Sequence, residues 1–380
     1  MAWWPDEEQF TGVFIKEHIK AIALRHDVQV IHIRYFRSGF SLPRTEFSST
    51  IEDGLPIHRI RIKTPIWRFG MLDRAIRSAY FKMTRKLTSK HRYDLVHVHV
   101  LDQTTRHVPA VAEALDLPMV LTEHFSFYHT GIKALPQEEQ VVQRKALQNW
   151  LSNDRLKLVM PVSKDLANVM IRDYHLVKEK VQVVPNIASD EFRPAGVKPA
   201  IPPFRLFTLA IWRPPKDHHV LIEALKLLPR QTTRQWEMVW GGYGPDMDTI
   251  IARCAEEIPW ISIKFTGYMD KEAIAREMRN AHLFVLPTTA ENLPCVLLES
   301  LCTGTPVISM AVNGIPEIVH ERNGILVPPS DPQALSKALL DAASEKVRFD
   351  HAAISNEAIS KYCETAVSTA IDQAYQRIGS

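Results

Sequence analysis

The chain has 380 residues, a length that favours two or three domains of about 150 residues each. Its 46 Lys and Arg residues against 43 Asp and Glu residues give a formal net charge of +3, so bulk charge does not indicate a polyanion-binding protein. Hydrophobic residues make up 46% and charged residues 23% of the chain, which excludes global disorder, a collagen-like repeat and a coiled coil.

No segment is expected to cross a membrane or to direct secretion. The longest uncharged run, residues 300–316, holds too many polar and turn-forming residues to span a bilayer. The first eight residues include two tryptophans, a proline and three acids, unlike a signal peptide. Neither a zinc site nor a disulfide framework is indicated by the spacing of Cys254, Cys295, Cys302 and Cys363. A reducing, cytoplasmic setting fits these features best.

Short apolar runs alternate with amphipathic stretches along the chain. The first half predicts strands over Val28–Ile33, Leu95–Val100, Met119–Thr122, Leu158–Val162 and Val181–Val184, and helices over Val13–Arg25 and Val108–Leu115. The second half predicts strands over Leu206–Ile211, Glu237–Trp240, Ile261–Phe265, Leu283–Leu286, Pro306–Ser309 and Ile325–Val327, and helices over Val220–Leu228, Lys271–Ala281 and Pro332–Ala342. Apolar strands separated by such helices indicate parallel α/β sheets. Two such series predict two Rossmann-like, doubly wound domains.

The best candidate linker is Phe192–Pro203, which has four prolines in twelve residues. A proline-rich stretch is a stiff spacer, which suits a hinge between two lobes. We therefore expect an N-terminal domain over residues 1–191 and a C-terminal domain over residues 204–361.

The segment Ile57–Arg92 holds eleven Lys or Arg residues and one acid, Asp73. Its first part, Ile57–Lys63, alternates like an edge strand, and Met71–Lys90 has helical spacing. A solvated charged surface is one interpretation. The other is contact with an anionic membrane surface, because the basic residues are interleaved with Ile66, Trp67, Phe69, Met71, Leu72, Ile76, Tyr80, Phe81 and Met83. No nucleic-acid recognition motif accompanies the charges.

Two carboxylates, Glu291 and Glu299, form the most informative pattern in the chain. Glu291 falls in the loop after a predicted strand, and Glu299 falls inside the apolar helix that begins near Pro294. Ligands of open α/β sheets bind at this edge, where a helix start offers free N–H groups to a phosphate. Carboxylates there are suited to accept hydrogen bonds from sugar or ribose hydroxyls. A capping acid and a solvated helix residue are the plainer interpretation.

The surrounding motifs favour the first interpretation. They are the loops Trp240–Pro245, Phe265–Tyr268 and Asn313–Glu317, the helix stop and buried strand of Cys302–Ser309, and Asn323–Pro328. Gly304 should stop the helix that carries Glu299. With this ordered set, the sequence resembles the family 4 glycosyltransferases, retaining enzymes that use nucleotide sugars. The resemblance implies the GT-B fold, in which two Rossmann-like domains face a central cleft.

The resemblance also implies roles for residues of the C-terminal half. Glu291 would contact hydroxyls of the donor sugar, Glu299 the ribose, and the N–H groups of Asn292 and Leu293 the sugar or diphosphate. Lys216 would bind the donor diphosphate together with Arg213, although Arg213 stands closer to Lys216 than the family spacing. Two surface cations are the alternative. The glycines expected to contact the donor are Gly12, Gly242, Gly244 and Gly267.

The N-terminal half resembles the family more loosely. His124, after the strand Met119–Thr122, matches a histidine that reaches the donor sugar, whereas His97 and His99 are better explained as structural. The last helix, expected over Tyr362–Ile378 in the closing segment 362–380, would return to complete the first domain. The family's first strand should precede Trp3, so either the chain begins late or the sheet is rearranged at its edge.

We therefore expect a hexose or N-acetylhexosamine to move from a nucleotide diphosphate sugar to an acceptor hydroxyl, with retention. The acceptor would be a growing glycan or a lipid-linked glycan of the cell surface, assembled at the inner membrane face. No paired acids mark a metal site, so metal independence and no further cofactor are expected. The alternatives are a nucleotide-sugar epimerase, a sugar phosphorylase, or a non-catalytic sugar-nucleotide binding protein.

Overall fold

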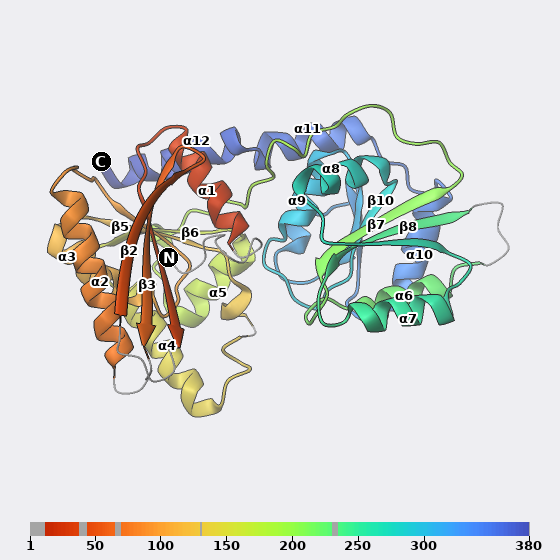
Figure 1. The fold of residues 1–380 in the computed structure, drawn as a ribbon. Helices are drawn as coiled ribbons and strands as arrows, with labels where there is room; N and C mark the ends of the chain where they lie inside the picture. The colour runs from red at the N-terminus through yellow and green to blue at the C-terminus, as the bar shows by residue number, and fades with distance from the viewer. Residues whose placement is uncertain (1–11, 38–43, 65–69, 130, 230–234, 380) are drawn as a thin grey trace. The chain divides into compact units, whose positions relative to one another are not determined.

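The computed structural model describes residues 12–37, 44–64, 70–129, 131–229 and 235–379. Contacts divide the chain into two compact units (Figure 1): unit 1 is Met1–Pro185 with Val367–Ser380, and unit 2 is Asn186–Ala366. The proline-rich stretch 192–203 thus belongs to unit 2. Phe192 is fully buried there, and the Lys198 ammonium donates to the main-chain carbonyl of Ala281 at 2.8 Å. The hinge role of this stretch stays a prediction.

Unit 2 is built on one six-stranded sheet. Its strands are β7 (Phe204–Ile211), β8 (Trp236–Tyr243), β9 (Ser262–Gly267), β10 (Leu283–Leu286), β11 (Val307–Met310) and β12 (Gly324–Val327). Their order is β12-β11-β10-β7-β8-β9, and every neighbouring pair is parallel. All six predicted strands of this half are confirmed, with ends that differ by a few residues.

Six α-helices of unit 2 connect or follow these strands: α6 (His218–Lys226), α7 (Met247–Glu257), α8 (Lys271–Asn280), α9 (Cys295–Cys302), α10 (Pro332–Ala343) and α11 (His351–Tyr362). Four of them are preceded by an N-cap aspartate whose carboxylate accepts a main-chain N–H three residues on, namely Asp217, Asp270, Asp331 and Asp350. As predicted, α9 ends just before Gly304, which has a φ of 77° that suits glycine.

The described residues of unit 1 form two three-stranded sheets. The first has the order β1-β3-β2, from β1 (Val30–Arg37), β2 (Arg44–Glu52) and β3 (Leu55–Thr64). The second has the order β4-β5-β6, from β4 (Val96–His99), β5 (Met119–Glu123) and β6 (Leu156–Pro161), and it is wholly parallel. The α-helices of this unit are α1 (Val13–Ala23), α2 (Met71–Thr88), α3 (Val108–Leu115), α4 (Gln137–Leu151), α5 (Lys164–Tyr174) and α12 (Glu364–Gly379).

Three sequence predictions for the secondary structure are wrong. Ile57–Lys63 is not an edge strand but part of β3, which pairs with β1 on one side and with the unpredicted strand β2 on the other. Val181–Val184 is not a strand and contributes one isolated bridge, from Val181 to Val159. The final helix does not start at Tyr362, because the helix breaks at Cys363 and Tyr362 ends α11. The expected first strand ahead of Trp3 lies outside the described residues.

The apolar residues of the basic segment serve the core of unit 1. Leu72, Ile76, Tyr80 and Met83 on α2 are each at most 4% exposed and pack in one hydrophobic cluster. These four residues are therefore not available for insertion into a membrane, whereas Met71 and Phe81 on the same helix are partly exposed. The exposed residues of α2 include the cations Arg74, Arg77, Lys82, Arg85 and Lys86. Ile66, Trp67 and Phe69 lie outside the described residues. Electrostatic membrane contact stays a prediction, which co-sedimentation with anionic vesicles at rising salt would test.

No helix in the described part of the chain is both long and apolar enough to cross a bilayer.

Buried histidines gather in unit 1. His18 on α1 and His99 on β4 are at most 1% exposed, and His124 is 6% exposed. His99 stacks on His97 and on His124, with ring centroids 4.2 and 5.7 Å apart. Burial and the neighbouring histidines lower the pKa of His18 and His99 well below the usual value. Burial also lowers the pKa of His97 to about 3, although its ring bonds to Tyr375 and Thr122.

These histidines should make unit 1 sensitive to acid. Their pKa values are lowered on folding, so below about pH 6.5 the unfolded chain takes up protons that the folded one does not. The free energy of unfolding should therefore fall as pH drops from about 6.5 towards 5. We expect His99→Gln to flatten this dependence and the exposed-site control His91→Gln to leave it unchanged. Urea unfolding of unit 1 across this pH range measures it, and equal slopes in all three proteins would contradict the assignment.

Candidate functional site

The strand order of unit 2 reverses beside β7. The chain passes outward from β7 through β8 and β9, then returns to the other side of β7 for β10, β11 and β12. In an open parallel sheet, a ligand crevice forms at the carboxyl ends of the strands that flank such a switch point. The loops at this point are residues 212–217 after β7 and 287–294 after β10, and they carry Lys216 and Glu291.

Main-chain contacts fix these two loops to each other. The Asp217 N–H donates to the Pro287 carbonyl at 3.2 Å, and the Thr289 N–H donates to the Pro215 carbonyl at 2.9 Å. Lys216 itself forms an isolated antiparallel bridge with Thr288. The position of Lys216 is therefore set by backbone hydrogen bonds between the two loops.

The structure brings two of the predicted site residues together. The Lys216 ammonium forms an ion pair with the Glu291 carboxylate, and the two side chains are only 17% and 16% exposed. Burial lowers the pKa of Lys216 to about 8. The Glu291 N–H donates to the side-chain oxygen of Asn313, in the loop after β11, at 3.2 Å. The result is a cation and an anion held side by side at the carboxyl edge of the sheet.

The start of α9 lies next to this pair along the chain. Asn292 and Leu293 are 4% and 6% exposed, and the Asn186 amide donates to the Leu293 carbonyl at 2.7 Å. Glu299 lies inside α9 and is partly exposed. The first turn of a helix has main-chain N–H groups without intrahelical acceptors, which suit a phosphate.

Two of the predicted donor glycines have a packing role at the carboxyl end of β8. A Cβ atom at Gly242 would lie 1.8 Å from the Ala210 carbonyl oxygen, and one at Gly244 would lie 2.3 Å from the Trp212 carbonyl oxygen. Only glycine lets this end of β8 approach β7 so closely. Gly267, by contrast, has a φ of 63° and open space where a side chain would be. The contact of Gly242, Gly244 and Gly267 with a donor stays a prediction.

Arg213 does not join the Lys216–Glu291 pair in this structure. Its side chain is exposed in the loop after β7, and its N–H donates to the Ile211 carbonyl at 3.0 Å. The role expected for Arg213 at the diphosphate stays a prediction.

In unit 1, His124 directly follows β5, as predicted. Its ring lies 4.8 Å from the ring of Phe14 and 4.8 Å from that of His18, both on α1. Gly12 precedes α1 with a φ of 77°, and its carbonyl accepts from the Ile15 and Lys16 N–H groups. The carboxyl end of β5 and the start of α1 thus meet around His124.

Glu123 holds the loop that carries His124. This fully buried carboxylate accepts from the main-chain N–H groups of His124 and Phe125 on one oxygen, at 2.9 and 3.0 Å. Its other oxygen accepts from the Leu101 N–H and the Tyr128 hydroxyl, both at 3.0 Å. Burial raises the pKa of Glu123 to about 7, and the four donors oppose that shift.

Sequence reasoning missed three residues that shape these loops, namely Glu123, Thr288 and Asn313. Thr288 and Asn313 contact distant residues, Lys216 and Glu291, and Glu123 accepts one of its four hydrogen bonds from the distant Leu101. Asn313 gives one usable signal, because it precedes a glycine and has a φ of 45°, which asparagine tolerates better than most residues.

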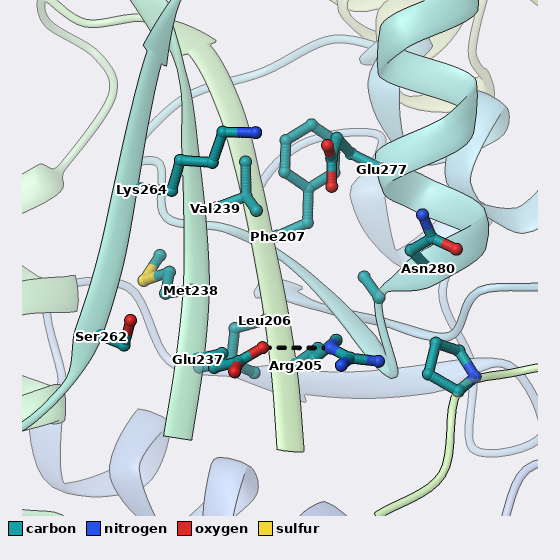
Figure 2. Close-up of a pocket in the computed structure, with 12 residues that line it drawn as sticks. Arg205, Leu206, Phe207, Glu237, Met238, Val239, Ser262, Lys264, Glu277 and Asn280 are labelled. Carbon is teal, nitrogen blue, oxygen red and sulfur yellow. Dashed lines mark hydrogen bonds and ion pairs between the residues drawn. The ribbon is translucent and has the colours of Figure 1, made fainter. Parts of the chain in front are cut away.

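Unit 2 has a pocket of about 400 Å³, and none of the predicted site residues lines it (Figure 2). It lies along β7, β8 and β9 beside α8, with the Arg205–Glu237 ion pair at 3.1 Å on its wall.

Within the described ranges, no group of three or more His, Cys, Asp or Glu residues is placed to hold a metal ion. The four cysteines are free thiols.

Comparison with known proteins covers most of the chain. Residues 11–192 match the family described as Glycosyltransferase Family 4, and residues 197–361 match Glycosyl transferases group 1. O-antigen chain mannosyltransferase B of Escherichia coli is 24% identical over 223 residues, which are 55% of this chain. The matched part spans 57% of the length of that relative.

Solved structures show the same architecture. Anabaena Alr3699/HepE, in complex with UDP, gives a TM-score of 0.63 at 18% identity over 77% of this chain and 81% of that one. Sucrose-phosphate synthase of Thermosynechococcus elongatus gives 0.70 at 18% identity over 97% of this chain and 93% of that one. The predicted fold class is confirmed by these neighbours, by the parallel sheet of unit 2 and by the parallel sheet β4-β5-β6 of unit 1. With both parts of the chain matched, the protein belongs to the family 4 glycosyltransferases of the GT-B fold.

Proposed function

We propose that this glycosyltransferase moves a hexose or N-acetylhexosamine from a nucleotide diphosphate sugar to an acceptor hydroxyl, with retention at the anomeric carbon. The observation that carries the proposal is the buried Lys216–Glu291 ion pair at the switch point of the unit 2 sheet. The donor diphosphate would take the Lys216 ammonium, and a sugar hydroxyl would donate to the Glu291 carboxylate. Lys216 and Glu291 would then each exchange their contact with the other for a contact with the donor. Neither charge would be left without a polar partner in a site shielded from water.

The nucleotide end of the donor would lie along α9. Main-chain N–H groups at the start of the helix suit the diphosphate, and Glu299 is placed to accept hydrogen bonds from ribose hydroxyls. In this arrangement, the phosphates face a cation and helix N–H groups, while both carboxylates face hydroxyls. No carboxylate of the protein would then face a phosphate of the donor.

Transfer would break the bond from the anomeric carbon to the diphosphate oxygen and form a bond to the acceptor oxygen on the same face. The acceptor proton passes to the leaving diphosphate. Lys216 and the helix N–H groups stabilise the charge that develops on that diphosphate, which is electrostatic catalysis by groups already in place. This scheme requires no metal ion. His124 in unit 1 would contribute to the transfer step rather than to holding the nucleotide.

UDP-sugars are the first donors to test, because HepE is seen with UDP at this fold. The name of the Escherichia coli mannosyltransferase supports an acceptor in cell-surface polysaccharide or glycolipid assembly. A thermal-shift screen across nucleotide sugars, followed by assay of nucleoside diphosphate release with and without glycan acceptors, tests the proposal. Release that no acceptor accelerates would argue against a transferase.

Lys216 should give donor use a characteristic pH dependence. Its pKa of about 8 means that the free enzyme loses the ammonium charge at alkaline pH, so kcat/KM for the donor should fall above about pH 8. Lys216→Arg keeps the charge and should lose this alkaline fall. Lys216→Gln should lower kcat/KM by roughly 10- to 100-fold below about pH 8, for the loss of one charged hydrogen bond, and the difference should shrink at alkaline pH, where native Lys216 loses its charge. Steady-state profiles from pH 6 to 10 measure these effects, and a profile that stays flat in the native enzyme would contradict them.

Glu299→Ala should weaken nucleotide binding while leaving the fold intact. The lost hydrogen bonds of a carboxylate to ribose are worth roughly 1.5–3 kcal/mol, or about 10- to 150-fold in Kd. Glu256→Ala is the matched control, because Glu256 is an exposed glutamate on α7. Titration calorimetry with the nucleoside diphosphate compares the two variants. An unchanged Kd for Glu299→Ala removes this residue from the site.

His124→Ala should lower kcat and leave nucleotide affinity nearly unchanged, because the imidazole acts in transfer. His97→Gln is the control, since it alters the same histidine cluster through the bonds to Tyr375 and Thr122. A structural role for His124 would instead lower thermal stability without a selective effect on kcat. Steady-state kinetics and melting curves on both variants distinguish a role of His124 in transfer from a structural role. Native turnover in His124→Ala would contradict the role in transfer.

A further inference from the structure

Several elements of unit 1 hold His124 in place. Its main-chain N–H donates to the buried carboxylate of Glu123 at 2.9 Å, which fixes the backbone at this position. The rings of Phe14 and His18 on α1 both lie 4.8 Å from its ring, inclined at 49° and 83° to it, and so limit how the ring can turn. A further contact comes from His99, the last residue of β4.

The contact between His99 and His124 is a hydrogen bond between the edges of two rings. The Nδ1 atom of His99 lies 3.4 Å from the Nε2 atom of His124. The rings are nearly parallel, with an interplanar angle of 20°, and their centroids are 5.7 Å apart. Because the nitrogens are much closer than the centroids, they lie on the facing edges of the rings. There an N–H of one ring can point at the lone pair of the other.

Burial decides which of the two rings donates. His99 is 1% exposed, and burial together with the neighbouring histidines holds its pKa well below the usual value, so the ring is neutral and carries one N–H. Its Nε2 atom is buried without a hydrogen-bond partner among the described residues. A proton there would be a donor without an acceptor, which folded proteins tolerate less often than an unpaired acceptor. The proton therefore belongs on Nδ1, and His99 donates to His124.

The direction of this hydrogen bond fixes the tautomer of His124. An Nε2 atom that accepts a hydrogen bond carries no proton, so the proton of His124 lies on Nδ1. The ring can then donate through Nδ1 but cannot take up a proton there. His99 is in this way the group that sets which nitrogen of His124 is protonated.

We propose that His99 is a positioning residue for the transfer step: its ring holds His124 as the Nδ1–H tautomer, so that His124 acts as a hydrogen-bond donor and not as a base. The role of His99 rests on the role proposed above for His124. It agrees with a transfer in which the leaving diphosphate takes the acceptor proton, because such a transfer needs no base from the protein.

The tautomer of His124 can be measured by NMR on the full chain with isotope-labelled histidine, since long-range correlations show which ring nitrogen carries the proton. His124→Ala identifies its signals among those of the 16 histidines. We expect the Nδ1–H form in the native protein and a mixture of tautomers in His99→Leu, which has no ring nitrogen. His99→Asn should keep the Nδ1–H form, because an amide N–H can replace the lost donor. An Nε2–H form in the native protein overturns the proposal, even if His99→Leu does not fold.

Steady-state kinetics test whether this tautomer matters for transfer. The donor is the nucleotide sugar that gives the largest thermal shift in the screen described above, and turnover is followed as release of nucleoside diphosphate. His99→Leu should lower kcat by roughly 3- to 10-fold, the effect of one neutral hydrogen bond, with KM for the donor nearly unchanged. His99→Asn should restore most of this loss. His97→Gln is the matched control, because the ring of His97 bonds to Tyr375 and Thr122, and it should keep the native kcat.

A double variant shows whether His99 acts through His124. If it does, His99→Leu should lower kcat no further in a protein that already carries His124→Ala. A further loss of the same size in the double variant overturns the proposal, and so does a native kcat in His99→Leu or an equal loss in His99→Leu and His99→Asn. Native turnover in His124→Ala would instead reject the role proposed for His124, and the NMR spectra would still decide whether His99 sets its tautomer.

Discussion

Parallel pairing of β7 with β10 is the constraint on which unit 2 and its candidate site depend. Leu206 and Phe207 pair with Leu283 and Phe284, and these four side chains are buried. Because the strands are parallel, the loops that leave them emerge at the same edge, although they stand some seventy residues apart in the chain. The hydrogen bonds between these loops then place Lys216 beside Glu291.

A mostly buried ion pair is a costly arrangement to maintain in the absence of a ligand. Desolvation opposes it, as the lowered pKa of Lys216 shows, and its Coulomb attraction offsets only part of that cost. Replacing either partner with a neutral residue would leave the other charge poorly solvated. In the proposed function, a bound diphosphate sugar would present an anion to Lys216 and hydroxyls to Glu291, and binding would satisfy both groups more fully than their contact with each other.

Much of this fold could be predicted from the sequence, because its strands are short apolar runs bounded by turn residues. Leu283–Leu286 and Val108–Leu115 were predicted to the residue. β2 could not be found in this way, since Arg44–Glu52 is mostly polar and exposed and is held by pairing with β3. β3 was misassigned as an edge strand, because alternating basic residues are typical of edges, yet Arg59 is 9% exposed and bonds to Glu52 and Thr50 on β2.

At the candidate site, too, local sequence patterns identify residues but not the contacts between them. Lys216 and Glu291 were identified from motifs, but their contact depends on strand order, which no local pattern contains. Of the four hydrogen bonds that Glu123 accepts, three come from His124, Phe125 and Tyr128 just after it in the chain, and the fourth comes from Leu101, which only the fold brings close. The glycines were predicted to contact the donor, and the structure adds a steric reason for Gly242 and Gly244 that a motif cannot supply.

The most direct test of the central claim is a crystal structure of the protein with a nucleotide diphosphate sugar, or with UDP. The account predicts a diphosphate within hydrogen-bonding distance of the Lys216 ammonium and a ribose within reach of Glu299, with the Lys216–Glu291 ion pair opened or shared with the ligand. A nucleotide bound elsewhere, for example in the pocket beside α8, with the ion pair intact, would contradict it.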